Sequence, residues 1–249
     1  MKTILITGAT SGIGKSTAEL FAKQGNRVII CGRRSEVLES VQSELSAFTE
    51  VLSLKFDVRN LEEVENAINS LPEEWKNIDV LVNNAGNAHG LDPLSAGKTD
   101  DWDSMIDGNV KGLLYVSKTI IPGMKERNSG HIVNISSVAA RQTYVNGVVY
   151  CATKKAVDVV SEGMRLELTE FGIRVTNIQP GAVETDFSLI RFKGDHERAS
   201  TVYAGYEPLK AEDIADAIAY CVNAPKHVNV SDMTIYPSAQ SEPRTIYRK

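Results

Sequence analysis

The chain has 249 residues, of which 42% are hydrophobic and 24% charged, a composition that excludes a disordered protein and suits one large core. Its formal net charge of −5, without a block of basic residues, argues against nucleic acid as a partner. No apolar stretch approaches the ~18 residues of a membrane span, and the first residues show no signal-peptide pattern, so we expect a cytoplasmic protein. Cysteines and histidines lack metal-type spacing, so we expect no metal site.

Short β-branched, apolar runs alternate with longer amphipathic segments along the whole chain, a pattern typical of repeated β-α units. The expected strands lie at 3–7, 27–31, 51–56, 80–83, 131–135, 174–178 and 234–236. Expected helices lie at 11–24, 35–46, 61–70, 152–170 and 211–223, and Asn60 is the expected N-cap of the third. The sequence therefore predicts an α/β fold: a single Rossmann-type domain over 1–249, with a doubly wound parallel seven-stranded sheet and helices on both faces.

A glycine-rich turn joins the first expected strand to the first expected helix. Glycines let the backbone approach a pyrophosphate closely, and the free amides at a helix start stabilise its negative charge. The spacing is Gly-x-x-x-Gly-x-Gly rather than the common Gly-x-Gly-x-x-Gly, and such a turn can also serve strand-to-helix packing alone. We expect a dinucleotide site that includes Gly8, Thr10, Ser11, Gly12, Ile13 and Gly14.

Two arginines follow the second expected strand, in the run Cys31-Gly32-Arg33-Arg34. An NAD-binding unit usually places an acidic residue here for the ribose hydroxyls, and this chain has none. Guanidinium groups suit the 2′-phosphate instead, so Arg33 and Arg34 favour NADP(H) over NAD. The alternative is that they are solvent-exposed residues at the helix entry.

Polar or small residues also follow the third, fourth and sixth expected strands. Because ligands of open α/β sheets bind outside the carboxyl ends of the strands, we expect one continuous cofactor groove there. The further residues expected in it are Asp57, Val58, Asn84, Ala85, Gly86, Pro180, Gly181, Val183 and Thr185.

Tyr150 and Lys154 stand four apart in an expected helical region, and therefore on one helix face. A neighbouring ammonium favours the phenolate and lowers the pKa of a tyrosine from its ordinary value near ~10. The pair is a candidate proton donor, although this spacing also occurs by chance on solvated helices.

Taken together, these motifs resemble the short-chain dehydrogenase/reductase family over nearly the full length of the chain. They are the glycine turn at 7–14, Asn-Asn-Ala-Gly at 83–86, Tyr-x-x-x-Lys at 150–154 and Pro-Gly at 180–181. The resemblance implies four catalytic residues, Asn109, Ser137, Tyr150 and Lys154, of which Tyr150 and Lys154 also contact the cofactor. It implies that Tyr150 transfers the proton, Ser137 polarises the substrate oxygen and Asn109 holds a water that relays protons from Lys154. Ser137 lies thirteen positions before the tyrosine, as is common in the family, and Ser136 is the second candidate.

A narrower resemblance links the segments 181–187, 191–194 and 233–240 to NADP-dependent 3-hydroxy acid dehydrogenases, including serine 3-dehydrogenases. It implies interconversion of L-serine, L-allo-threonine or 3-hydroxypropionate with the matching 3-oxo acids or semialdehydes. The segment 183–210 lacks clean periodicity, so we expect a substrate loop, either a lid or a surface excursion with short helices.

A carboxylate substrate needs a cation near the reacting carbon, and Arg191 and Lys193 are the candidates, unless one or both point to solvent. Arg191 is preferred for its fork geometry. The expected substrate-binding residues are thus Ser137, Tyr150 and Arg191.

Two other functions fit the same motifs: a carbonyl or 3-oxoacyl reductase of another substrate class, and an NADP-binding sensor without turnover. A sensor has no need of the intact serine, tyrosine and lysine. The helices expected at 112–124 and 152–170 are more apolar than the outer helices of a monomer, and the family resemblance implies that they pack into a homotetramer.

Overall fold

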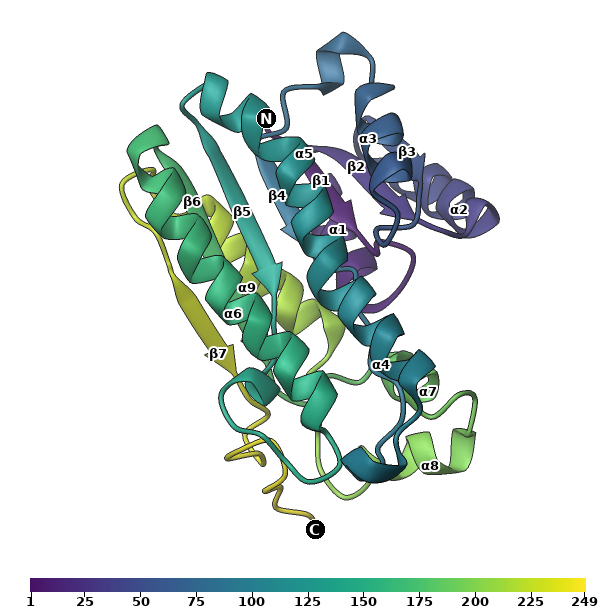
Figure 1. The fold of residues 1–249 in the computed structure, drawn as a ribbon. Helices are drawn as coiled ribbons and strands as arrows, with labels where there is room; N and C mark the ends of the chain where they lie inside the picture. The colour runs from purple at the N-terminus through teal and green to yellow at the C-terminus, as the bar shows by residue number, and fades with distance from the viewer.

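The computed structural model describes all residues 1–249 and contains a seven-stranded sheet, shown in Figure 1, with the strand order β3-β2-β1-β4-β5-β6-β7. All neighbouring strands are parallel. The strands are β1 (Thr3–Thr7), β2 (Arg27–Gly32), β3 (Val51–Lys55), β4 (Val80–Asn83), β5 (Gly130–Ile135), β6 (Ile173–Pro180) and β7 (Asp232–Ile235). The predicted fold class, a single-domain doubly wound parallel sheet, is confirmed.

Nine α-helices connect and flank the strands: α1 (Gly12–Lys23), α2 (Ser35–Leu45), α3 (Leu61–Asn69), α4 (Thr99–Ile106), α5 (Gly112–Glu126), α6 (Val148–Leu168), α7 (Phe187–Arg191), α8 (His196–Thr201) and α9 (Ala211–Asn223). A π-helical turn, η3 (Asp107–Lys111), joins α4 to α5. The predicted cap of α3 is confirmed, because the Asn60 side chain accepts hydrogen bonds from the amides of Glu62 and Glu63 at 3.1 and 3.3 Å. None of the helices combines the length and apolar character needed to cross a membrane.

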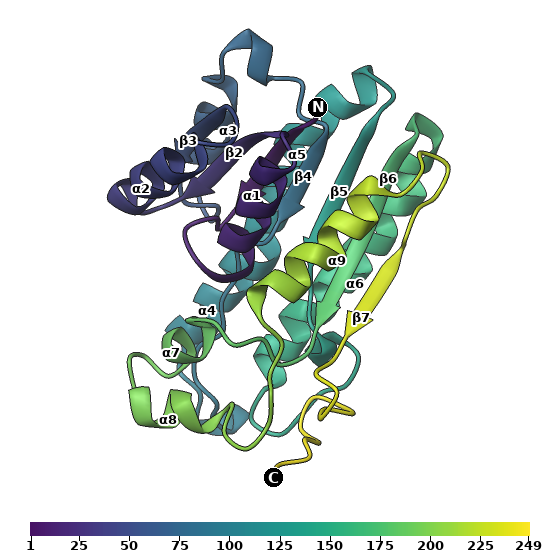
Figure 2. The same ribbon diagram turned by 180° about the vertical axis from the view of Figure 1, so that it is seen from behind.

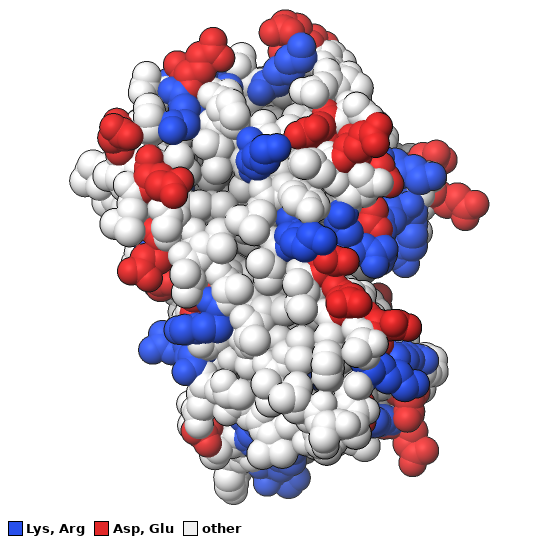
Figure 3. Space-filling view, in the orientation of Figure 1, with Lys and Arg blue, Asp and Glu red and all other residues white.

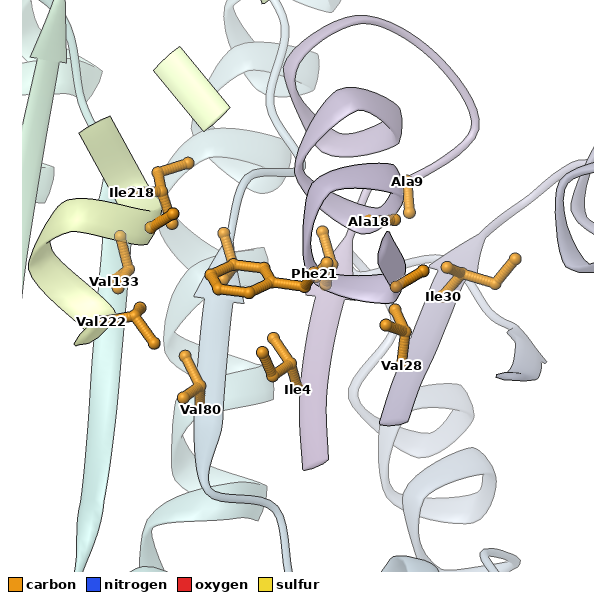
Figure 4. Close-up of a cluster of buried hydrophobic side chains, with 14 of the residues drawn as sticks. Ile4, Ala9, Ala18, Phe21, Val28, Ile30, Val80, Val133, Ile218 and Val222 are labelled. Atoms are coloured by element: carbon orange, nitrogen blue, oxygen red, sulfur yellow. The ribbon is translucent and has the colours of Figure 1, made fainter. Parts of the chain in front are cut away.

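Each face of the sheet has its own hydrophobic core, because alternate strand residues point to opposite faces. Helices α5 and α6 cover one face in Figure 1, whereas α1 and α9 cover the other in Figure 2. Figure 4 shows the ring of Phe21, from α1, lying over Ile4 and Val80 of the sheet and close to Ile218 of α9. Packing on both faces fixes the strand register and hence the position of every strand end.

The carboxyl ends of the strands share one edge of the sheet, beside which α4, α7 and α8 lie in both ribbon views. β1 lies between β2 and β4, so the connections leave in opposite directions on its two sides. Ligands of open α/β sheets bind at such a switch point.

Some element boundaries differ from the sequence expectations. Helix α6 begins at Val148 rather than at 152, so Tyr150 lies in its first turn. Strand β6 extends to Pro180, and β7 covers 232–235 rather than 234–236. The expected loop at 183–210 contains the short helices α7 and α8.

Candidate active site

A groove of about 750 Å³ runs along the carboxyl edge of the sheet. Because the strand ends meet there, it gathers residues that lie far apart in the sequence. The expected residues that line it are Gly8, Thr10, Ser11, Gly12, Ile13, Arg33, Arg34, Asp57, Val58, Asn84, Ala85, Gly86, Ser137, Tyr150, Lys154, Pro180, Gly181, Val183 and Thr185.

The glycine-rich turn forms the groove wall at the start of α1. Gly8 and Gly12 have φ angles of 65° and 51°, which L side chains rarely adopt, and a Cβ at Gly12 would lie 3.2 Å from Thr185 Cγ2. Helix α1 has neither a capping side chain nor an acidic residue in its first turn, so its first amides are available to an anion. Gly14 is not a groove residue: its Cβ would collide with the Gly8 carbonyl and the Asn84 side chain, so it serves close packing.

Arginine side chains line the groove beyond β2 and β3. Nη2 of Arg34 donates to Thr10 Oγ1 at 3.0 Å, and Nη1 of Arg33 lies 3.7 Å from Asp57 Oδ2. Arg59, which the sequence interpretation missed, donates to both carboxylate oxygens of Asp57. Burial alone would raise the pKa of Asp57, but the hydrogen bonds from Arg59 and the charge of Arg33 lower it. The groove thus presents cationic groups suited to a phosphate.

Asn84 fastens the end of β4 to the glycine turn. Its side-chain Nδ2 donates to the carbonyls of Thr7 and Gly8, at 2.9 and 3.2 Å, and its backbone N–H donates to Thr7 Oγ1 at 3.0 Å. These bonds hold two walls of the groove at a fixed separation.

Tyr150 and Lys154 lie on one face of α6, and both are buried. Nζ of Lys154 lies 6.0 Å from the centroid of the Tyr150 ring and donates to the Ile135 carbonyl at 2.9 Å. Burial lowers the pKa of Lys154 to about 8, an effect that the negative charge of Asp158 opposes. The Lys154 side chain can therefore exchange its proton not far from neutral pH.

The pKa of Tyr150 is shifted in the opposite direction from the sequence expectation. Burial and the nearby Tyr144 raise it well above its usual range, while Ser137 and the charge of Arg191 act to lower it. Desolvation disfavours a buried phenolate, and Lys154 does not offset this cost in the structure. The expected lowering by Lys154 is thus absent, because its ammonium is turned to the Ile135 carbonyl.

The two adjacent serines after β5 have different environments. Ser136 is buried, and its Oγ donates to Asp158 Oδ1 at 2.8 Å and contacts the Lys154 carbonyl at 3.0 Å. Ser137 accepts from the Ala139 amide at 3.1 Å and acts on the ionisation of Tyr150. The geometry thus favours Ser137 as the serine beside the tyrosine and gives Ser136 a structural role.

Asn109 lies in the π-helical turn η3 and is buried. Its Oδ1 accepts from the Asn87 amide at 2.7 Å, and its Nδ2 donates to the Asn87 carbonyl and to Thr153 Oγ1, at 2.8 and 3.0 Å. A Cβ at Gly86 would lie 2.9 Å from this Oδ1 and 3.4 Å from Lys154 Nζ. Asn109 does not line the groove; it shapes the loop beside Lys154.

Arg191 and Lys193 point in different directions. Arg191 donates through Nε to the Gly90 carbonyl at 3.2 Å and through Nη2 to the Tyr144 hydroxyl at 3.1 Å, and its guanidinium lies 5.5 Å from the centroid of the Tyr150 ring. Lys193 forms an ion pair with Asp101 at 2.8 Å. Of these two cations, the structure therefore brings only Arg191 close to Tyr150.

A second, smaller pocket adjoins the groove, and Tyr150 and His89 line both. Arg191, Trp102, Met105 and Val149 also line this pocket. Sequence patterns gave no signal for most of these residues, because α4 and the segment before α6 are brought together only by the fold. A charged group of a small molecule in this pocket would lie near both Tyr150 and Arg191.

The sequence and the structure of this chain are both similar to those of short-chain dehydrogenases. A sequence model of the short chain dehydrogenases matches residues 2–193. The chain is 45% identical to NADP-dependent 3-hydroxy acid dehydrogenase of Salmonella typhi, over 96% of each chain, and 44% identical to serine 3-dehydrogenase of Rhizobium radiobacter, over 96% of this chain and 95% of that one. It is also similar to the closed form of a serine dehydrogenase complexed with NADP⁺, with a TM-score of 0.93 and 42% identity over 99% of this chain and 100% of the other.

Proposed function

The chain belongs to the short-chain dehydrogenase family, and we propose that it is an NADP-dependent oxidoreductase of short 3-hydroxy acids. The substrates proposed are L-serine, L-allo-threonine and 3-hydroxypropionate, interconverted with the matching 3-oxo acids or semialdehydes. The observation that carries this choice is the guanidinium of Arg191 at 5.5 Å from the Tyr150 ring. A cation at this distance from Tyr150 supports a substrate that carries a carboxylate.

The groove fits NADP(H). The uncapped amides of α1 and the turn at Gly8 and Gly12 suit the pyrophosphate, and the guanidinium groups of Arg33 and Arg34 suit the 2′-phosphate. Other residues proposed to hold the cofactor are Asp57, Val58, Asn84, Ala85, Gly86, Tyr150, Lys154, Pro180, Gly181, Val183 and Thr185. When bound, the nicotinamide supplies or accepts the hydride.

Side chains of the protein accept and return the proton, and they orient the substrate. We propose that Tyr150 takes the hydroxyl proton during oxidation and returns it during reduction, while the Ser137 hydroxyl hydrogen-bonds the same substrate oxygen. A protonated Lys154 that turned from the Ile135 carbonyl toward the phenol would stabilise the phenolate. Asn109 bonds both the backbone N–H and the carbonyl of Asn87 and so fixes the loop that follows Gly86.

Arg191 would hold the substrate carboxylate. Its Nε and one Nη are directed by Gly90 and Tyr144, which fixes the plane of the guanidinium. A planar, fixed fork suits bidentate binding of a carboxylate, and it costs little further side-chain entropy. A 3-hydroxy acid bound in this way would present its hydroxyl toward Tyr150.

The test compares a 3-hydroxy acid with an uncharged alcohol of similar size. NADP⁺ reduction is measured with L-serine, 3-hydroxypropionate and 1-propanol, for the wild type, Arg191→Met and the matched control Lys193→Met. Loss of a charge-assisted hydrogen-bonded pair should raise KM for the acids roughly 10- to 100-fold in Arg191→Met and leave 1-propanol unchanged. Turnover of uncharged substrates alone would instead indicate a carbonyl reductase of another class.

We also propose that the chain assembles as a homotetramer. Figure 3 shows few charged side chains over the middle of the face that α5 and α6 form. Leu114, Val159 and Leu166 are exposed on these helices, with 40%, 59% and 81% of their surface accessible. Exposed apolar side chains on adjacent helices are typical of interfaces between copies. Light scattering tests this, and a monomer would contradict it.

A further inference from the structure

A carboxylate that the reaction described above does not use lies one helical turn after Lys154. The side chain of Asp158 on α6 is only 15% exposed. Its Oδ1 accepts from Ser136 Oγ and from Asn177 Nδ2, both at 2.8 Å, and its Oδ2 accepts from Gln179 Nε2 at 3.1 Å. A largely buried carboxylate with three hydrogen-bond donors is fixed in position.

The partners of Asp158 belong to the strand ends that carry the site. Ser136 follows β5, directly before Ser137, and its backbone N–H donates to the Ile178 carbonyl of β6 at 2.8 Å. Ser136 Oγ also lies 3.0 Å from the carbonyl of Lys154. Asn177 and Gln179 are residues of β6. One carboxylate thus joins α6 to the ends of β5 and β6.

The surroundings of Lys154 hold few other charges. From α6 itself, Tyr150 and Asp158 are the ionisable groups that face it, and Asp158 is the one charge that acts on its ionisation. The other elements offer neutral groups, the Ile135 carbonyl of β5 and the Asn109 side chain of η3.

The cations near the carboxylate are largely exposed or contact other groups. Lys155 lies 3.9 Å from Asp158 Oδ2 with a side chain that is 64% exposed, and Arg141 contacts Gln179 at 3.4 Å. Asp232, on the far side of Asn177, is paired with Arg165 at 3.3 Å. Screening by solvent makes the exposed ions weak influences on a buried ammonium.

We propose that Asp158 is a positioning residue of the active site, which supplies the counter-charge of the Lys154 ammonium and, through Ser136, fixes the backbone that presents Ser137. Helix α6 carries Tyr150, Lys154 and Asp158, so a bond from Asp158 to the end of β5 sets the tyrosine and the serine relative to each other. The proposal rests on the proposed oxidoreductase function for its effect on turnover, but its effect on Lys154 does not depend on any substrate.

Asp158→Asn removes the charge at nearly constant shape, and Glu162→Gln is the matched control, since Glu162 lies four residues later on the same helix and is exposed. The readout is an NMR pH titration of ¹³Cε-labelled lysine in the protein alone, with the Lys154 signal assigned through Lys154→Met. Removing a negative charge should lower the Lys154 midpoint by roughly one unit in Asp158→Asn and leave it unchanged in Glu162→Gln. An unchanged midpoint in a folded Asp158→Asn protein would overturn the counter-charge role.

Ser136→Ala tests the positioning role while the Asp158 carboxylate is retained. It replaces Asp158→Asn as the test if that variant does not fold. The Lys154 midpoint should stay at the wild-type value, while kcat for the best substrate of the wild type should fall roughly tenfold with little change in KM. Wild-type kcat in Ser136→Ala would overturn the positioning role. If the wild type turns over no 3-hydroxy acid, the proposed substrate class fails, yet the Lys154 titration still decides the role of Asp158.

Discussion

The guanidinium of Arg191 and the hydroxyl of Tyr144 are joined by a hydrogen bond of 3.1 Å, across 47 positions of sequence. Tyr144 belongs to the segment between the two serines and α6, and Arg191 ends α7. The bond therefore connects the end of α7 to the segment that precedes α6. Arg191 also donates to the Gly90 carbonyl. Together these two hydrogen bonds hold the guanidinium at the pocket that Tyr150 also lines.

Tyr144→Phe removes this hydrogen bond but keeps the ring against which Arg191 packs, at 5.7 Å. A net hydrogen bond contributes about 1 kcal/mol, so we expect KM for 3-hydroxypropionate to rise roughly fivefold with little change in kcat. Steady-state kinetics check this, with Tyr220→Phe as the control, since Tyr220 is 67% exposed on α9. An equal rise in KM for 1-propanol would show that the pocket has been disordered in general.

Tyr150→Phe removes the proposed proton donor and retains the ring that packs against Phe187, with centroids 5.8 Å apart. A positioned acid or base contributes roughly 10²- to 10⁴-fold in rate, and turnover should fall by at least the lower figure. NADPH binding, measured by fluorescence, should stay within a few-fold of the wild type. Near-normal turnover in this variant would refute the role of Tyr150.

Arg34→Ala should weaken the preference for NADP⁺ over NAD⁺ and leave the chemical step unchanged. A charge-assisted bond to a phosphate contributes about 1.5 to 3 kcal/mol, so Kd for NADP⁺ should rise roughly 10- to 100-fold. Kd for NAD⁺, which lacks the 2′-phosphate, should change little. Calorimetric titration with both nucleotides measures the difference, and Arg198→Ala on α8 serves as the control. Equal weakening of both would place Arg34 outside the 2′-phosphate site.

The sequence alone predicted the sheet, most helices and the residues at strand ends, because alternation of apolar runs and strand-end motifs are local signals. It placed the start of α6 four residues late, since Val148 and Val149 are β-branched and Gly147 provides no side-chain cap. It preferred Arg191 to Lys193 only for the geometry of its guanidinium. Helix α7 ends at Arg191, and Lys193 follows it with a φ angle of 55°, so only the folded chain shows which of the two side chains faces the site.

Contacts between distant segments carried no sequence signal. The hydrogen bonds from Ser136 and Asn177 to the Asp158 carboxylate depend on where α6 and the strand ends meet in the folded protein. The orientation of Lys154 toward Ile135 likewise follows from burial of α6 against β5. Charge and hydrogen-bond partners of a buried group are set by tertiary packing, so the sequence spacing of Tyr150 and Lys154 could not give their pKa values.

Lys154 should cost the protein stability, and the cost should depend on pH. Burial lowers its pKa from 10.5 to about 8, so below pH 8 both folded and unfolded chains carry the charge and the full penalty of burying it applies. Between those two values the unfolded chain binds more protons, and the contribution of Lys154 to stability rises with pH. A shift of the pKa from 10.5 to about 8 corresponds to a penalty of about 3 kcal/mol.

Lys154→Met should therefore be more stable than the wild type at about pH 7, by roughly 2 kcal/mol once the lost hydrogen bond to Ile135 is counted, and inactive. The difference should shrink as pH rises through about 8 toward 10.5, where the wild-type lysine becomes neutral in both states. Urea unfolding at several pH values measures it. Lys155→Met is the control, since its side chain is 64% exposed and its removal should leave the pH dependence as in the wild type. A Lys154→Met protein less stable than the wild type at every pH would show that the ammonium stabilises the fold.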